Sequence, residues 1–149
     1  MKFAECKNHK DSIGLLFWQS SMLWQRKIKQ VLQPYNLTHT QFVILAVIEE
    51  LSEQEICITQ KRISDFSMID VMTVSSTVRL LEKKALVCRL PHKTDTRANS
   101  IFNTEKGQDL LRQAVVEVEG IDKTFFFVNE VENNQLQSIL SNLLEKNSE

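Results

Sequence analysis

The chain has 149 residues, a hydrophobic content of 42% and a formal net charge of −1, so we expect one domain with a substantial core over residues 1–149. Its three cysteines are odd in number and widely separated, which argues against a disulfide scaffold and favours a reducing compartment. No apolar run approaches the roughly 20 residues that span a bilayer, and the polar N-terminus is unlike a signal peptide, so a cytoplasmic protein is expected.

The first predicted element is a long helix from Ser12 to Leu32, which ends before Pro34. Its apolar residues cover two sides of the helix rather than one. They are Ile13, Leu16, Phe17, Trp24, Ile28 and Val31 on one face, with Leu15, Trp18 and Met22 beside it. A helix with two apolar sides packs against its own domain and against something else, unless it is the central helix of a monomer.

The second predicted helix opens with a capping-box pattern, in which Thr38 is the cap and Gln41 follows three residues later. The segment from Phe42 to Leu51 is nearly all apolar and therefore suits the middle of the core. Residues 56–58, Ile-Cys-Ile, are expected to form a short strand beside a later hairpin.

A brief helix is predicted from Gln60 to Phe66, with Thr59 as its cap. In a helix-turn-helix it would be the first helix, which crosses the DNA backbone. Lys61 and Arg62 near its start are candidates for phosphate contacts, with solvated surface charge as the alternative.

A further amphipathic helix is predicted over residues 70–85, with Asp70 as its N-cap. At about 100° per residue, one stripe of this helix is apolar and faces a core. That stripe contains Val71, Val74, Val78, Leu81 and Ala85. The opposite side has Met72, Ser76, Arg79 and Lys83, with Thr73 and Ser75 on its flanks. This face suits a DNA major groove, because hydroxyls and arginine hydrogen-bond base edges, an apolar tip touches a thymine methyl group and lysine reaches phosphate. An ordinary amphipathic surface helix is the alternative.

Two short apolar runs, 87–90 and 100–102, flank a polar segment that is too long for a tight turn. They predict an antiparallel hairpin with a protruding loop, or wing. Lys93 and Arg97 in this loop would reach a neighbouring groove or the DNA backbone, and Asp95 would fix the loop or the arginine. A helix followed by a hairpin at this spacing is the pattern of a winged helix-turn-helix.

Two more helices are predicted after the wing, from about Gln108 to Phe127 and from Gln135 to Lys146. The polar segment 129–134 separates them. Charge is unevenly distributed along the chain: residues 61–104 carry eight Lys or Arg and four Asp or Glu, whereas residues 105–149 carry four and nine. A basic central segment in an acidic protein favours duplex DNA as a partner for one side of the molecule.

From about Leu37 to Gly107 the chain resembles the MarR family of bacterial transcription regulators. The matching segments, in order, are LTHTQFVIL, ITQKRIS, IDVMTVSSTVRLLEKKALV, HKTDTRA and TEKG. Two departures stand out. Ala85 occupies a position where a glycine is usual between helix and strand, and Ser67-Met68 stands where many members have an apolar residue followed by glycine.

The resemblance implies a mainly α homodimer with a winged helix-turn-helix lobe over 37–104 and a dimerisation platform made by 12–33 and 108–146. The recognition helix, 70–85, would enter the major groove, and the wing, 91–99, would approach the minor groove. The expected DNA-binding residues are Met72, Thr73, Ser75, Ser76, Arg79, Lys83, Lys93, Asp95, Arg97, Lys61 and Arg62.

An enzyme is not expected from this sequence. It contains no GxSxG, P-loop, GxGxxG or HExxH motif. The three histidines lie in different predicted elements and none has a cysteine or carboxylate at metal-ligand spacing, so neither a metal nor a cofactor is expected.

Members of the resembled family often respond to small aromatic or anionic molecules that bind between the platform and the DNA-binding lobe. The resemblance therefore suggests an effector pocket near Trp18, Met22 and Trp24, with ordinary core or interface packing as the alternative for each. The sequence as a whole predicts a DNA-binding repressor of a pseudo-palindromic operator, released by such an effector. A winged-helix module that binds protein instead of DNA is the competing interpretation.

Overall fold

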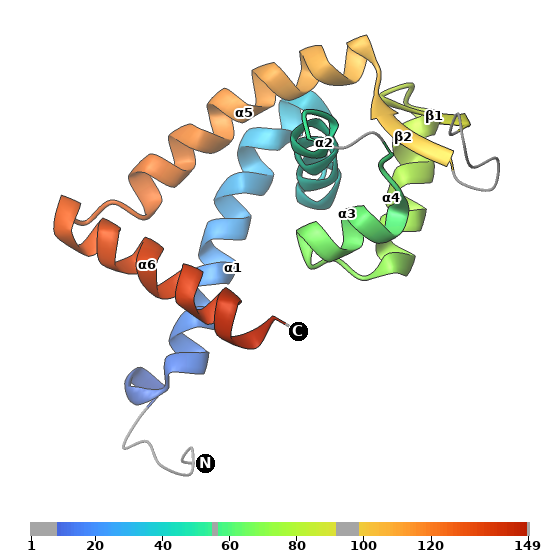
Figure 1. Ribbon diagram of the computed structural model, residues 1–149. Helices are drawn as coiled ribbons and strands as arrows, with labels where there is room; N and C mark the ends of the chain where they lie inside the picture. The colour runs from blue at the N-terminus through green and yellow to red at the C-terminus, as the bar shows by residue number, and fades with distance from the viewer. Residues whose placement is uncertain (1–8, 55–56, 92–98, 149) are drawn as a thin grey trace.

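The computed structural model describes residues 9–54, 57–91 and 99–148 (Figure 1). Its elements confirm the expected fold class, mainly α with one β-hairpin. A 3-10 turn at His9–Asp11 precedes α1, and another at Gln33–Tyr35 follows it. The other elements are α1 (Ile13–Leu32), α2 (His39–Ser52), α3 (Gln60–Ser67), α4 (Val71–Lys83), β1 (Val87–Pro91), β2 (Asn99–Asn103), α5 (Glu105–Phe125) and α6 (Glu130–Asn147).

The predicted helix starts in the first half of the chain are confirmed. Ser12 caps α1 and Thr59 caps α3 through side-chain oxygens that accept backbone N–H groups. At α2 both capping-box bonds are present: the Thr38 hydroxyl accepts the Gln41 N–H at 3.1 Å, and the Gln41 side chain accepts the Thr38 N–H at 3.2 Å. Each cap satisfies N–H groups that the helix itself cannot satisfy.

Helix α2 lies at the centre of the core, as its apolar sequence predicts. Its residues Ile44, Leu45, Ile48 and Leu51 are completely buried. Helices α3, α4 and α5 and strand β2 pack around it, which gives a compact head made of α2, α3, α4 and the hairpin (Figure 1). We use the name head for these elements below.

The hairpin pairs β1 with β2 in antiparallel register, with Val87 opposite Asn103. Ile58 borders β2, since the Ile101 N–H donates to the Ile58 carbonyl at 2.9 Å. The short strand expected at 56–58 is nevertheless not formed at residues 57 and 58; residue 56 lies outside the described ranges. Ile58 makes a second hydrogen bond to β2, from its N–H to the Ser100 hydroxyl. These two bonds take the place of the regular backbone pairing of a third strand.

The last two helices begin earlier than the sequence suggested. Helix α5 begins at Glu105 rather than 108, because the Thr104 hydroxyl accepts the Gly107 N–H and caps it. Helix α6 begins at Glu130 and runs through the segment expected to break it, because Asn129 caps it in the same way. In both cases a polar segment that looked like a loop is the capped first turn of a helix.

Figure 1 shows α5 running from the hairpin to the far end of the molecule, where α6 folds back. Helices α1 and α5 pack against each other. Helix α6 has no buried residue, although Leu136, Ile139, Leu143 and Leu144 are apolar and exposed. We refer to α1, α5 and α6 as the platform.

Candidate nucleic-acid interface

Helix α4 has a firmly bonded cap. Asp70 adopts an extended conformation before the first turn, and its carboxylate accepts the Thr73 N–H at 2.9 Å and the Thr73 hydroxyl at 2.6 Å. The hydrogen bond from the Thr73 hydroxyl, together with the weaker effect of the Thr73 N–H, holds the pKa of the Asp70 carboxyl below its usual range. A negative charge is therefore fixed at the N-terminus of α4, where it also interacts favourably with the helix dipole.

Helix α4 buries one face and exposes the other. Its buried residues are Val74, Thr77, Val78 and Leu81. The prediction that the apolar stripe is buried is wrong at its two ends. Val71 is 49% exposed, and Ala85 is exposed and lies beyond the end of the helix at Lys83. Ala85 leaves the stripe because its backbone is left-handed, with φ of 61°, so helical periodicity no longer applies there.

The residues expected to read DNA from α4 share its outer face. Met72, Ser76, Arg79 and Lys83 are exposed, while Thr73 and Ser75 are half-buried on the flanks. The Ser76 hydroxyl donates to the Thr73 carbonyl at 3.1 Å, and the Arg79 guanidinium donates to the Ser75 hydroxyl at 3.3 Å. These exposed bonds lie within one helix and can be exchanged for bonds to a ligand at small cost.

Helix α3 carries the two cations proposed for phosphate contacts. Lys61 is exposed and lies 3.5 Å from the Asp65 carboxylate one turn later. An exposed pair of this kind contributes less than about 1 kcal/mol, so the ammonium can turn to another anion. The Arg62 guanidinium lies 5.7 Å from the centre of the Phe66 ring, a cation–π contact that orients it.

The turn between α3 and α4 forms without the usual glycine. Met68 adopts a left-handed conformation with φ of 64°, and its N–H donates to the Ser64 carbonyl. The Ser64 hydroxyl also bonds across the turn, to the Ile69 carbonyl at 2.6 Å. Serine and backbone bonds thus hold a conformation that costs a methionine about 1 kcal/mol or more.

An ion pair connects strand β1 of the hairpin to helix α4. Arg89 of β1 donates from Nε to the Glu82 carboxylate of α4 at 2.7 Å, with both side chains about two-thirds buried. Lys93, Asp95 and Arg97 lie in the 92–98 segment, outside the described residues. The sequence interpretation missed Arg89 and Glu82, since their contact depends on how the strand turns back along the helix.

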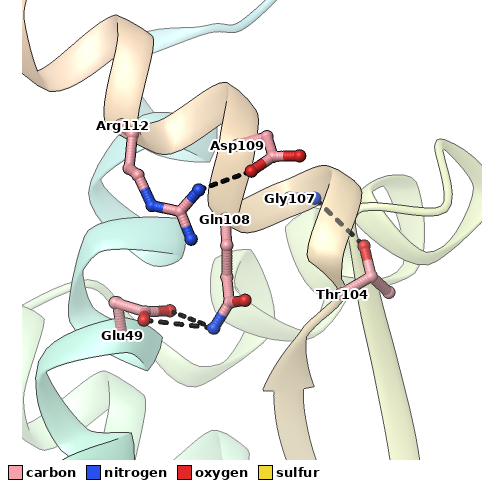
Figure 2. A network of polar contacts seen from close by, with 6 residues as sticks. All are labelled: Glu49, Thr104, Gly107, Gln108, Asp109 and Arg112. Atoms are coloured by element: carbon pink, nitrogen blue, oxygen red, sulfur yellow. Dashed lines mark hydrogen bonds and ion pairs between the residues drawn. The ribbon is translucent and has the colours of Figure 1, made fainter.

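A polar network joins the platform to the head (Figure 2). The Glu49 carboxylate of α2 accepts the Gln108 amide of α5 at 3.2 Å and the Asn103 amide of β2 at 3.0 Å. Gly107 lies beside this network, and a Cβ at this position would be 2.1 Å from the Leu86 carbonyl oxygen. The TEKG segment therefore needs its glycine for the close approach of α5 to the head.

An open cavity of about 630 Å³ lies where α1, the start of α2 and the end of α4 meet. Basic side chains and a histidine line it, namely Arg26, Lys29, His39 and Lys84. Of the three residues suggested for an effector pocket, Met22 lines this cavity. Trp18 is 62% exposed on α1, and the Trp24 indole donates to the Asp122 carboxylate of α5 at 2.8 Å.

His39 lies at the junction of three helices. Its ring packs edge-on against Trp24 of α1 at 5.1 Å between centres. Burial lowers the pKa of His39, and the nearby Asp122 carboxylate of α5 opposes this shift in part. The imidazole is therefore mainly neutral at pH 7.

Residues 9–54, 57–91 and 99–148 contain neither a candidate metal cluster nor a candidate membrane-spanning helix. Within those ranges, no cluster of three or more histidine, cysteine, aspartate or glutamate side chains could hold a metal ion. No helix described by the structure is both long and apolar enough to cross a membrane.

Comparison with known proteins identifies the family. Residues 33–122 match the model of the ArnR1-like winged-helix domain. The chain is 38% identical over 115 residues to Bacillus subtilis YdcH, described as an uncharacterised HTH-type transcriptional regulator, and the match covers 77% of this chain and 78% of YdcH.

Two solved DNA complexes have similar structures. The S. aureus MepR–DNA complex gives a TM-score of 0.81 at 25% identity, covering 92% of this chain and 97% of MepR. A mutant of E. coli MarR complexed with operator DNA gives 0.81 at 22% identity, covering 95% and 99%. These relatives are transcription regulators and not enzymes, and the chain belongs to the MarR family of winged-helix transcription regulators.

Proposed function

We propose that this protein is a repressor that binds a pseudo-palindromic DNA operator as a homodimer, with α4 in the major groove and the wing, residues 91–99, at the minor groove. The observation that carries the proposal is the outer face of α4. Met72, Ser76, Arg79 and Lys83 project together from a helix whose opposite face is locked into the core. A face of small hydroxyls, one arginine and one apolar tip matches the edges of bases.

Electrostatics supports the same orientation. Residues 61–104 carry a net charge of +4, whereas residues 105–149 carry −5. Phosphates are therefore attracted to the side of α3, α4 and the wing and repelled from the C-terminal helices. Affinity should fall steeply as salt increases, because each neutralised phosphate releases counterions.

The homodimer is inferred from the platform. Helix α1 exposes Ile13, Phe17 and Trp18, and α6 has no buried residue at all. Apolar helix faces of this extent require a partner, and a second copy presents the same faces in a closed two-fold arrangement. Two heads related by a two-fold axis read two half-sites related in the same way, which is why the operator is expected to be pseudo-palindromic.

Release by a small anionic effector is the regulatory part of the proposal. The cavity between α1 and the head is lined by Arg26, Lys29 and Lys84, a set of cations that suits a carboxylate. Lys84 already connects the end of α4 to α2 and to the segment between α1 and α2, donating to the Asn36 carbonyl at 2.6 Å and to Gln41 at 3.0 Å. An anion that draws Lys84 away from these partners would favour head positions that no longer match two half-sites.

The test is selection of random duplexes by the purified protein at near-physiological salt with excess nonspecific DNA. We expect an inverted repeat with half-sites about one helical turn apart. Arg79→Ala should weaken binding and change the preferred bases, whereas Lys61→Ala should weaken all duplexes alike and reduce the salt dependence. Enrichment of no sequence would favour the competing class, a winged-helix module that binds protein.

A further inference from the structure

The outer face of α4 has an unusual centre. Met72 is 83% exposed, which makes it one of the two most exposed large apolar side chains in the part of the chain that the structure describes. At about 100° per residue, Met72 projects opposite the buried stripe, in line with Arg79 and Lys83. Exposing this side chain to water brings no stability, because nothing in its own helix covers it.

The polar neighbours of Met72 in the first turns of α4 are already bonded. The Thr73 hydroxyl donates to Asp70 at 2.6 Å, which leaves it able to accept but not to donate elsewhere. The Ser76 hydroxyl donates to a backbone carbonyl, and the Ser75 hydroxyl accepts from Arg79. The leading part of the helix therefore presents one exposed apolar side chain, Met72, among hydroxyls that are bonded within the helix.

Asp70 determines what this end of the helix can approach. Its carboxylate is exposed and held in the ionised form by Thr73, so a phosphate brought to the N-terminus of α4 would meet a like charge. The leading end is thus directed toward base edges rather than toward the backbone. Among the four bases, only thymine presents an apolar group, its 5-methyl, in the major groove.

We propose that Met72 reads the 5-methyl group of one thymine in each half-site, an inference that rests on the DNA-binding function proposed above. The flexible thioether chain of methionine covers a methyl group without requiring a fixed hydrogen-bond geometry. Removing one buried methyl group from such a contact weakens binding by about fourfold. Removing it from both half-sites weakens binding by about 16-fold.

The experiment uses duplexes enriched from the random pool and resynthesised with uracil replacing thymine at one position at a time. Uracil pairs like thymine and lacks only the methyl group. The parent should lose roughly fourfold in affinity at one position per half-site. Met72→Ala should bind the thymine duplex more weakly and should no longer distinguish thymine from uracil at that position.

Val71→Ala is the matched control, since it truncates an exposed apolar side chain in the same turn, about 100° from Met72. It should keep the discrimination of the parent. If duplexes are enriched but the parent ignores the methyl group, or Met72→Ala still senses it, the inference fails while the proposed function stands. If no sequence is enriched, both fail.

Discussion

Helices α2 and α6 are both rich in apolar residues, yet the structure uses them in opposite ways. Seven residues of α2 are buried, and they are surrounded by α3, α4, α5 and the hairpin. In α6 none is buried, and Ile139 is 55% exposed. The head thus completes its own core within one chain, whereas the platform leaves apolar side chains exposed, as the proposed homodimer requires.

Ile139→Asp should break the platform and leave the head folded. A charge placed in an apolar interface between two copies would raise the dimer dissociation constant by at least about 100-fold. Sedimentation equilibrium measures the change, and Ser141→Asp on the polar side of α6 is the control. A parent protein that is already monomeric, or a variant that still dimerises like the parent, would contradict the division.

Gly107→Ala tests the point where platform meets head. The added Cβ would lie 2.1 Å from the Leu86 carbonyl oxygen, a backbone atom that cannot move alone. We expect the free energy of unfolding to fall by about 3 kcal/mol in chemical denaturation. Gly120→Ala, in the same helix with nothing within 4 Å, should instead raise it by about 0.5–1 kcal/mol. If Gly107→Ala and Gly120→Ala changed the free energy of unfolding equally, α5 would not approach the Leu86 carbonyl as closely as described.

Ala85→Gly should stabilise the head, because glycine adopts the left-handed conformation found at this position without strain. The expected gain in the free energy of unfolding is about 1 kcal/mol. Ala114→Gly, at a buried helical position of α5, should reduce the same quantity. A loss of stability in the first variant would show that the methyl group of Ala85 contributes more than the strain costs.

His39→Gln should give the smallest effect, a change in pH dependence at the junction. The pKa of His39 is lowered in the folded state, so the unfolded chain binds more protons and folding is disfavoured as pH falls below the ordinary histidine value of about 6.5. Stability of the parent should therefore decline between pH 7 and 5 more steeply than that of the variant. Urea titrations at each pH measure the free energy of unfolding. If it falls equally with pH in parent and variant, groups other than His39 cause the decline.

The sequence predicted the head better than the platform. Caps such as Thr38 and Asp70 act within three residues, so their helices could be located from local pattern alone. Thr104 and Asn129 are caps of the same kind, but each is followed by polar residues and was interpreted as a loop. Periodicity identified the outer face of α4, whereas Val71 and Ala85 show that it fails at helix ends.

Contacts between distant segments could not be predicted in this way. The Arg89–Glu82 pair, the Glu49 network and the basic cavity each depend on how separate elements pack. Apolar pattern also did not reveal which surface a helix buries within its own chain. Ile13 and Ile28 belong to the same predicted stripe of α1, yet Ile28 is completely buried and Ile13 is exposed.

The indole of Trp24 in α1 donates a hydrogen bond to the Asp122 carboxylate in α5. Residues 98 positions apart meet there, beside His39 and Phe126, at the junction of the two parts of the molecule. The chain has only one other tryptophan, Trp18, which is exposed on α1. Tryptophan fluorescence of a Trp18→Phe variant would therefore come from Trp24 alone and report on the junction. A Trp24→Phe variant would leave only Trp18, whose emission would change if the exposed surface of α1 became covered.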